Sequence, residues 1–486
     1  MTRLPLETGT LLDGFLLGTQ LHRGGMATIW EVSHPDHPGP LLMKVPVLSE
    51  GVDPAAIVGF EMEQMILPRL GGPHVPRFVA QGDFSLQPYL VMERIPGPSL
   101  LTKLQNLPLP WEEVVKIGST IAMALDDLHR QHVVHLDVKP SNLLVRPTGE
   151  IVLVDFGLSH HMQLPDLMGE EFRLPYGTAP YMATEQVMGL RRDPRSDQFA
   201  LGVLLYFFLT GTRPFGDPQR LSGLKRRIWR DPVPPRRLQA DCPPWLQEII
   251  LRCLEVHPAW RYPTAGHLAM ALTHPAEVKL TARSERMKRD AFTTVMRRRF
   301  SGLQLTLPAA KPPSGHDGDA PILAVAVDLS KAAAPVAEAL RTLLARMIPA
   351  LPGARIACLN VLKQGRITLD TTLDDQGRNI HHQRLVELRN WAEGLHLEEG
   401  RLSFHVLASP DPAGAILQFV GANHVDHVVM GARASSWRRT LLGSVSSQVA
   451  SQAPCTVTIV RSRRLRKHEY HPTDVEGDSD TPWTVG

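Results

Sequence analysis

The sequence predicts at least two folded domains, of which the C-terminal one is an α/β domain with a doubly wound parallel sheet. The chain has 486 residues, enough for two or three domains that each bury a core. Residues 308–319 (PAAKPPSGHDGD) have the composition of a linker. After Pro321, near-continuous apolar runs alternate with helical stretches, an order typical of a parallel sheet that helices cover on both faces.

Five apolar runs predict the strands of this sheet, and two alanine-rich or amphipathic stretches predict helices between them. A strand that is buried on both faces reads as a continuous apolar run, whereas a strand with one solvated face alternates. The expected strands are residues 322–327, 356–362, 404–407, 425–430 and 456–460, and the expected helices are residues 335–348 and 381–394.

The overall charge argues against a bulk polyelectrolyte partner. Charged residues make up 21% of the chain and the formal net charge is +3, so the sequence does not predict nucleic-acid binding. Basic residues cluster at 283–299 and 461–467. A solvated helix face and a tail explain these clusters better than contact with an anionic surface does.

Cysteine usage and hydropathy predict a cytoplasmic protein without a membrane span. The four cysteines are scattered with no CxxC pair, which fits a reducing compartment and does not fit a zinc site. Residues 1–13 contain no apolar core of a signal peptide. The most apolar run, residues 199–209, has about half the length that a membrane span needs and is better interpreted as a buried core helix.

The central motif of the chain is residues 135–157, HLDVKPSNLLVRPTGEIVLVDFG, which carries Asp137, Lys139, Asn142 and Asp155 at fixed intervals. It resembles the catalytic loop and the magnesium-binding motif of eukaryotic-type protein kinases. The resemblance implies that Asp137 orients the attacking hydroxyl, that Lys139 assists it, and that Asn142 and Asp155 hold magnesium. Unrelated loop polar residues are the alternative interpretation. The lysine, the proline and the DFG sequence in register argue against it.

A glycine-containing hairpin is expected near the N-terminus, where a strand from residue 15 to 21 is followed by HRGGMATIW. This resembles the loop that covers the ATP phosphates in bacterial serine/threonine kinases, in which glycines let backbone amides approach phosphate oxygens. His22 stands where the first glycine is usual, and Ala27 stands where the last is usual. The nucleotide contacts that the resemblance implies are Gly24, Gly25, Met26, Ala27 and Ile29.

Lys44 lies in a strand-like stretch that resembles the third-strand lysine motif of kinases. The resemblance implies that its ammonium bridges the α- and β-phosphates of ATP and is held by a carboxylate of the following helix, residues 55–70. Glu63 is the expected partner, with Glu61 as the second choice. A surface lysine and a solvated glutamate are the alternative.

Residues 89–95 (YLVMERI) are expected to form a buried strand that ends at a Pro-Gly-Pro sequence. In the kinase resemblance this stretch is the hinge. Met92 would line the back of the adenine pocket, and backbone groups from Glu93 to Ile95 would contact the base. Residues 111–129 then have the apolar period of a helix that leads into the catalytic loop.

After the DFG sequence, residues 158–175 are expected to form a loop, and residues 177–185 resemble the GT-x-x-Y-x-A-P-E stretch of kinases. Thr184 stands in the place of the proline. The resemblance implies a buried ion pair between Glu185 and Arg261, since an unpaired buried charge is expensive.

The segment after the DFG sequence also predicts how the protein is controlled. In kinases with an arginine before the catalytic aspartate, that guanidinium waits for an activation-loop phosphate. Here the position is Leu136, and residues 160–177 contain no serine or threonine and only one hydroxyl, that of Tyr176. Ser159 lies too close to the DFG aspartate, and Thr178 is expected to be engaged structurally. We therefore predict a kinase that activation-loop phosphorylation does not gate. Expression level, partners or a regulatory C-terminal domain would control it instead.

The kinase resemblance covers residues 14–274, including Asp197, which is expected to hold the catalytic loop from beneath. It implies an α+β bilobal protein kinase fold, ATP and Mg²⁺ with Mn²⁺ as the alternative metal, and protein substrates. Residues 275–320 are expected to form a connector, with a basic helix over 276–300 followed by the linker. Residues 321–461 form the α/β domain, and the tail, residues 462–486, is expected to be disordered.

The end of the chain, from VVMGARA at residue 428 through LGSVSS to APCTVTIV, resembles the universal stress protein family. In that family a glycine loop before a helix start cradles ATP phosphates. The resemblance implies an adenine nucleotide near Asp328, Gly431, Gly443 and Ser444. Leu329 and Ala434 depart from that family's pattern. A module that binds no nucleotide and forms a homodimer is the alternative.

These motifs together predict a cytoplasmic bacterial-type serine/threonine protein kinase fused to a universal stress protein-like domain. The first alternative is a pseudokinase scaffold that binds nucleotide or partners without turnover. His22 and Thr184 favour this alternative. The complete set of catalytic residues speaks against it. The second is a small-molecule phosphotransferase, which residues 177–185 and Asp197 disfavour.

Overall fold

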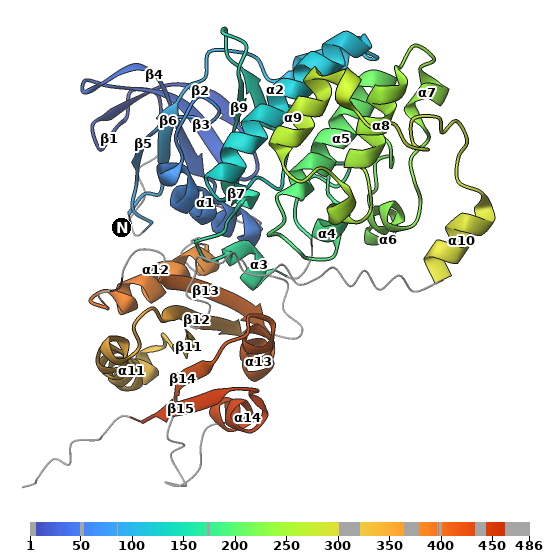
Figure 1. Ribbon diagram of the computed structural model, residues 1–486. Coiled ribbons are helices and arrows are strands. Elements are labelled where there is room, and N and C mark those ends of the chain that lie inside the picture. The colour runs from blue at the N-terminus through green and yellow to red at the C-terminus, as the bar shows by residue number, and fades with distance from the viewer. Residues whose placement is uncertain are drawn as a thin grey trace, which may run out of the picture.

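The computed structural model describes residues 6–48, 53–84, 86–172, 175–300, 321–363, 379–395, 397, 401–432 and 444–461. Figure 1 shows a bilobal N-terminal domain, coloured blue to yellow-green, and below it a C-terminal domain coloured gold to red. No helix in the described ranges has the length and apolar character that a bilayer crossing requires.

The first lobe is built on an antiparallel sheet of strand order β1-β2-β3-β4-β6-β5. Helix α1 (Pro54–Ile66) accompanies this sheet and begins where the Asp53 side chain accepts a hydrogen bond from the Ala55 amide. The strands are β1 (Leu11–Leu12), β2 (Phe15–Arg23), β3 (Ala27–His34), β4 (His37–Pro46), β5 (Phe78–Gln81) and β6 (Leu90–Glu93).

The second lobe is mainly helical, with α2 (Trp111–Arg130) packed against α5 (Arg195–Thr210) and α9 (Ala265–Thr273). The apolar stripe predicted on α2 is buried at Ile121, Leu125 and Leu128. Two small strand pairs, β7 (Val133–Val134) with β10 (His160–His161) and β8 (Leu143–Val145) with β9 (Ile151–Leu153), frame the loop between the lobes. The remaining helices are α4 (Thr184–Val187), α6 (Leu221–Leu224), α7 (Pro235–Leu238), α8 (Pro244–Cys253) and α10 (Phe292–Phe300).

Two expectations about local structure are wrong. The stretch 158–175 is not a plain loop, because it contains β10 and a short helix, α3 (Leu167–Glu171), whose N-cap is the Asp166 side chain. The basic stretch 276–300 is α-helical only in α10. Between residues 278 and 291 it lies on the second lobe instead, where Arg283 pairs with Glu248.

The C-terminal domain has the predicted parallel sheet, with strand order β13-β12-β11-β14-β15. Side chains of α11 and α12 pack on one face, and those of α13 and α14 pack on the other, so the sheet is covered on both sides. The elements are β11 (Ile322–Ala326), α11 (Ala334–Met347), β12 (Arg355–Lys363), α12 (Ile380–Ala392), β13 (Leu402–Ser409), α13 (Pro412–Ala422), β14 (His427–Gly431), α14 (Ser444–Gln452) and β15 (Thr456–Val460).

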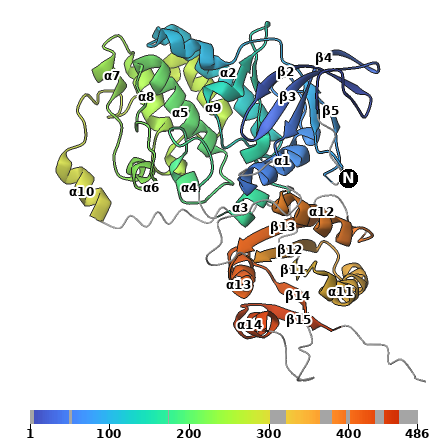
Figure 2. The same cartoon turned by 180° about the vertical axis from the view of Figure 1, so that it is seen from behind.

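The two domains touch along α1 and α3 of the kinase-like domain and along α12 and β13 of the C-terminal domain (Figures 1 and 2). Leu385 of α12 and Val406 of β13 belong to the same apolar cluster as Phe60 of α1 and Leu167 of α3. The hydrophobic core is therefore continuous across the domain boundary. The predicted tail from residue 462 onward lies outside the described residues.

Candidate active site

Lys44 links the sheet of the first lobe to the DFG aspartate. It lies on β4 between Ile29 of β3 and Leu90 of β6. Its Nζ donates to Glu63 Oε2 at 2.6 Å and to Asp155 Oδ1 at 2.9 Å. The ion pair that the sequence predicts between Lys44 and Glu63 is thus present.

The electrostatics of this cluster keep its central members ionised. Burial opposes the charge of Lys44, but the carboxylates of Asp155 and Glu63 outweigh it and raise the pKa of Lys44 above its usual value. The Lys44 ammonium in turn holds the pKa of Asp155 below its usual value. A fixed cation beside a fixed anion is the arrangement needed to receive phosphate oxygens on one side and a metal ion on the other.

The catalytic-loop aspartate, Asp137, is 5% exposed and is held from several directions. Its Oδ1 accepts from the Thr178 hydroxyl at 2.7 Å and from the Thr178 amide at 3.0 Å. Its Oδ2 accepts from Lys139 Nζ at 2.6 Å and from Asn142 Nδ2 at 3.2 Å. Lys139 also donates to the Thr178 hydroxyl at 3.1 Å, so both ends of the carboxylate are oriented.

The loop itself is fixed from below by Asp197, which is fully buried near the start of α5. The Asp197 carboxylate accepts from the amides of His135 and Leu136, each at 2.8 Å, and contacts His129 Nε2 at 2.8 Å. Leu136 adopts a left-handed backbone conformation with φ of 63°, which exposes its amide to this anchor.

Asn142 and Asp155 come from adjacent parts of the β8–β9 hairpin, because the Val154 amide donates to the Asn142 carbonyl at 3.1 Å. Asn142 Nδ2 donates to the Asp137 carbonyl at 3.0 Å, which turns the amide nitrogen toward the loop. Asp155 keeps 46% of its side chain exposed. An amide oxygen and an accessible carboxylate are suitable oxygen ligands for a hard cation such as Mg²⁺, so these residues fit the metal that the resemblance implies.

The predicted phosphate loop is the turn between β2 and β3. The Gly24 amide donates to the Ala27 carbonyl at 3.0 Å, and the Met26 side chain is exposed. A Cβ at Gly24 would lie 3.1 Å from His22 Nε2, whereas a Cβ at Gly25 would meet nothing within 4 Å. The side chain of the unusual His22 therefore packs against Gly24, and a larger residue at position 24 would require His22 to move slightly.

The predicted hinge follows β6. Met92 and Ile95 are buried, while the Glu93 side chain forms an ion pair with Arg146 at 2.6 Å. The Glu93 amide donates to the Arg77 carbonyl at 2.9 Å. Any contact of Glu93 with an adenine base must therefore use its carbonyl oxygen, not its amide.

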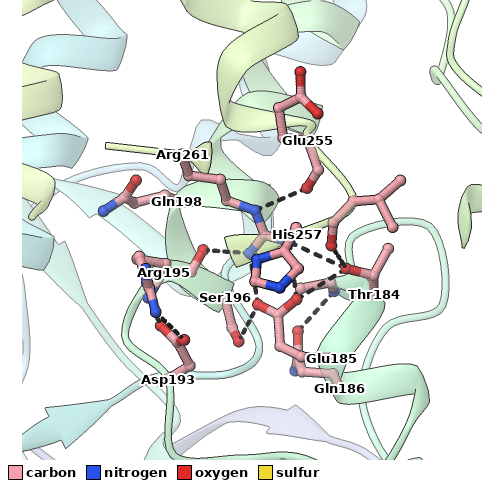
Figure 3. A network of polar contacts seen from close by, with 12 residues as sticks. Thr184, Glu185, Gln186, Asp193, Arg195, Ser196, Gln198, Glu255, His257 and Arg261 are labelled. Carbon is pink, nitrogen blue, oxygen red and sulfur yellow. Dashed lines mark hydrogen bonds and ion pairs between the residues drawn. The ribbon is translucent and has the colours of Figure 1, made fainter. Parts of the chain in front are cut away.

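The buried pair of Glu185 and Arg261 that the sequence predicts is present and lies in the network of Figure 3. Arg261 donates from both terminal nitrogens to Glu185, at 2.5 and 2.8 Å, and its Nε donates to the Glu255 carbonyl at 3.0 Å. Thr184, in the place of proline, donates to the Val256 carbonyl at 2.6 Å and accepts from Arg261 at 3.1 Å. The substitution therefore extends the network and does not weaken it.

The C-terminal domain contains a cavity of about 730 Å³ at the carboxyl ends of its strands. Asp328, Gly431 and Ser444 line it together, and Asp328 Oδ1 accepts from the Ser330 amide at 3.0 Å. A Cβ at Gly431 would lie 2.3 Å from Val336 Cγ1, so only glycine fits there. The predicted contact Gly443 lies outside the described residues.

The residues that join the domains were not predicted from the sequence. Arg389 of α12 contacts Glu61, which the sequence offered only as a second partner for Lys44. Arg355 and His405 contact Glu170. The only local signal was the pair of glutamates two positions apart on α1, which a helix must place on different faces.

Comparison with known proteins identifies both parts. Residues 18–275 match the protein kinase domain family, and residues 322–461 match the universal stress protein family. Serine/threonine-protein kinase PknL of Mycobacterium tuberculosis is 32% identical over 278 residues, which cover 57% of this chain and 69% of PknL. PknF of the same organism is 29% identical over 278 residues, covering 56% of this chain and 58% of PknF.

A crystal structure of the Mycobacterium tuberculosis PknI kinase domain has 24% identity and a TM-score of 0.44, and the match covers 56% of this chain and all of that chain. The chain belongs to the protein kinase family and carries a second domain of the universal stress protein family.

Proposed function

We propose that the chain is a serine/threonine protein kinase that transfers the γ-phosphoryl group of ATP to a hydroxyl group of a protein. The observation that carries the proposal is the single contact set formed by Lys44, Glu63 and Asp155, next to a loop in which Lys139 and Thr178 orient Asp137. The names of its relatives PknL and PknF, both serine/threonine-protein kinases, support the same activity.

In this proposal each residue has one task. Lys44 binds the α- and β-phosphates, and Asp137 orients the substrate hydroxyl and accepts its proton. Lys139 balances the charge that develops near Asp137. Asn142 and Asp155 would hold Mg²⁺ or Mn²⁺, which neutralises phosphate charge when bound. The hydroxyl oxygen bonds to the γ-phosphorus, the bond from that phosphorus to the bridging oxygen breaks, and ADP leaves.

The test is transfer of labelled phosphate from ATP to a generic basic protein, with wild type compared with Asp155→Ala. Asp36→Ala is the matched control, because Asp36 lies in the exposed turn between β3 and β4 with 86% of its side chain accessible. We expect Asp155→Ala to lose orders of magnitude in rate and the control to match wild type. Nucleotide binding without transfer by wild type would instead support a pseudokinase scaffold. Transfer only to small molecules would support a small-molecule phosphotransferase.

A second candidate function is nucleotide binding by the C-terminal domain, favoured by the cavity that Asp328, Gly431 and Ser444 line. Its volume of about 730 Å³ is within the range of small-molecule sites. We propose an adenine nucleotide there, and homodimer formation through this domain as the alternative. Titration of full-length Lys44→Met with ATP, ADP and AMP is the test. Absence of heat would leave the dimer or a docking role.

We also propose the domain limits 14–274, 275–320 and 321–461 as units of function, with substrates bound by the first.

The buried side chains of Cys242, Cys253 and Cys358 are free thiols, as is Cys455. Free thiols are typical of a reducing compartment, which supports placement in the cytoplasm.

A further inference from the structure

Helix α1 is held from two opposite sides by two neighbouring glutamates. Glu63 faces into the catalytic cleft, where it accepts from Lys44 at 2.6 Å and from the Phe156 amide at 3.3 Å. Glu61 faces away from the cleft, where it pairs with Arg389 of the C-terminal domain. Glu61 is 3% exposed, so this ion pair is removed from water and depends strongly on its partner.

Apolar and aromatic groups surround this second ion pair. The guanidinium of Arg389 lies over the ring of Phe84 at 5.1 Å and over that of Phe404 at 5.0 Å. Phe84 also packs against Phe60 of α1, with ring centroids 5.9 Å apart. His382 of α12 stacks on Phe84 at 5.9 Å. Arg389 therefore joins α1 to the C-terminal domain through both charge and packing.

The helix α3, in the segment after the DFG sequence, is held by the same domain. Arg355 of β12 donates to both oxygens of Glu170, each at 2.6 Å. His405 of β13 lies 3.1 Å from Glu170 and 3.2 Å from Glu171. The kinase side contributes three acidic groups and the C-terminal side contributes three basic ones, so the surfaces are complementary in charge.

The described part of the kinase-like domain offers neither a serine or threonine near α3 to phosphorylate nor an arginine before Asp137 to bind the phosphate. The residue before Asp137 is Leu136, and residues 160–177 contain no serine or threonine. Asp166, which caps α3, is paired with Arg191 at 2.9 Å. Arg355 and His405 of the C-terminal domain instead supply the positive charge next to α3.

We propose that the C-terminal domain is a built-in activator, which binds α1 through Arg389 and α3 through Arg355 and His405 and so holds the cleft in its catalytic arrangement. This inference rests on the proposed kinase function. An inhibitor would be expected to disturb the contact of Lys44 with Glu63, yet that contact is intact in the docked state. The state in which the C-terminal domain contacts α1 and α3 is therefore also the state in which the cleft is ordered.

The experiment uses full-length protein and charge reversal at the interface. Three variants are compared with wild type: Arg389→Glu, Glu61→Arg and the double exchange. Arg384→Glu is the matched control, because Arg384 lies on the same helix but pairs with Glu387 within it at 2.6 Å. The readouts are amide hydrogen exchange in α1 and the initial rate of phosphate transfer to a generic protein substrate.

We expect each single reversal to increase exchange in α1 and to lower the rate by roughly tenfold, a typical size for coupling between sites. The double exchange should recover a large part of both losses, and Arg384→Glu should match wild type. An equivalent pair, Arg355→Glu with Glu170→Arg, should repeat this result at α3.

Two results would overturn the activator: reversals that leave exchange and rate within twofold of wild type, and reversals that raise the rate. Failure of the kinase function is distinguishable. If wild type transfers no phosphate but Arg389→Glu increases exchange in α1 and the double exchange restores protection, the docking stands and the kinase function fails.

Discussion

The kinase cleft and the cavity of the C-terminal domain are both candidate nucleotide sites, but they are built differently. In the cleft, ion pairs and hydrogen bonds of 2.6 to 3.0 Å orient Lys44, Asp155 and Asp137. In the cavity, most of the described lining is uncharged, and Gly431 is required by shape, because a side chain there would strike Val336. The cleft is specified by charge, and the cavity by the space between strands and helices.

This difference predicts that a change of charge will affect the cleft most. Replacing Lys44 with methionine removes the cation between Glu63 and Asp155 and leaves two carboxylates facing each other. We expect the transfer rate to fall by about a thousandfold or more, since preorganised charge supplies several kcal/mol. Initial rates at saturating ATP measure the effect. A rate within tenfold of wild type would contradict the view that charged groups determine the activity of the cleft.

The buried ion pair of Glu185 and Arg261 should have the second largest effect, in this case on the stability of the kinase domain. Glu185→Gln leaves Arg261 buried with an incomplete set of partners, and breaking such a pair costs about 3–5 kcal/mol. Calorimetry on the full chain should show a lower unfolding temperature for the kinase domain. Asp193→Asn is a suitable control, because its pair with Arg195 is more exposed. Equal shifts in both variants would contradict the special role of the Glu185 pair.

The cavity should respond to volume. In full-length Lys44→Met, a further Gly431→Val change would place side-chain atoms against Val336 and occupy space at the cavity rim. We expect adenine nucleotide affinity for the C-terminal domain to fall by about tenfold or more, while Ala422→Val, at the end of α13, leaves it unchanged. Titration calorimetry measures both. Unchanged affinity in Gly431→Val would place the nucleotide elsewhere.

The cleft was predictable because its residues are fixed by short loops with characteristic spacing. Asp137, Asn142 and Asp155 lie on or next to the β8–β9 hairpin, so residues that are near in sequence are also near in space. The parallel sheet was predictable because strands buried on both faces are continuously apolar. Both are local signals.

The interface was not predictable for the opposite reason. Glu61 and Arg389 are 328 residues apart, and neither has a local feature that marks it as an interface residue. Helix α3 has only five residues, too few for a periodic pattern, and its stability comes from Asp166 and from packing on β13. Tertiary contacts determine both.

The interface also brings titratable groups together, which predicts a pH dependence of docking. Burial alone would lower the pKa of His405, but Glu170 and Glu171 outweigh it and raise the pKa to about 9. Burial raises the pKa of Glu171 to about 7, with Glu61 and Glu170 adding to the effect. Arg355 also faces Glu170, and with His405 it lowers the pKa of Glu170 to about 2 in spite of burial.

These pKa shifts make docking weaker as pH rises above neutral. His405 and Glu171 have higher pKa values in the docked state, so their contribution is present at low pH and is lost as pH rises through about 7 and about 9. Glu170 loses its contribution only below about pH 4.5. Burial lowers the pKa of His381, which lines the same interface, to about 4. Protonation of this residue therefore opposes docking only when the pH falls below the ordinary pKa of histidine.

We therefore expect the protection of α1 amides, corrected for intrinsic exchange, to decrease several-fold between pH 7 and pH 9.5. The variant His405→Gln should show a smaller change over this range, because the group that titrates near 9 is absent. A protection factor that rises with pH, or a slope that His405→Gln leaves unaltered, would remove His405 from the docking contact.

The smallest expected effect is that of phosphatase treatment, for which we predict none. Ser159 is fully buried, and its hydroxyl donates to the His135 carbonyl at 3.1 Å. Thr178 is engaged with Asp137 and Lys139 through the contacts that orient the catalytic loop. Tyr176 is the one remaining hydroxyl of the segment, and its ring packs on Phe172 at 5.1 Å. The hydroxyl groups of Ser159 and Thr178 are therefore engaged, which leaves Tyr176 as the one candidate in this segment for an activating phosphate.

Leu136 in addition offers no cation to receive one, and α3 is already bound by Arg355 and His405. Freshly purified, phosphatase-treated protein should therefore phosphorylate substrate from the first time point. Tyr176→Phe should show the same progress curve, because it removes the segment's last candidate hydroxyl and keeps the ring. A lag that preincubation with ATP abolishes, with a phosphate mapped between residues 159 and 178, would show that the segment is gated by charge after all. The C-terminal domain would then be one of two activators.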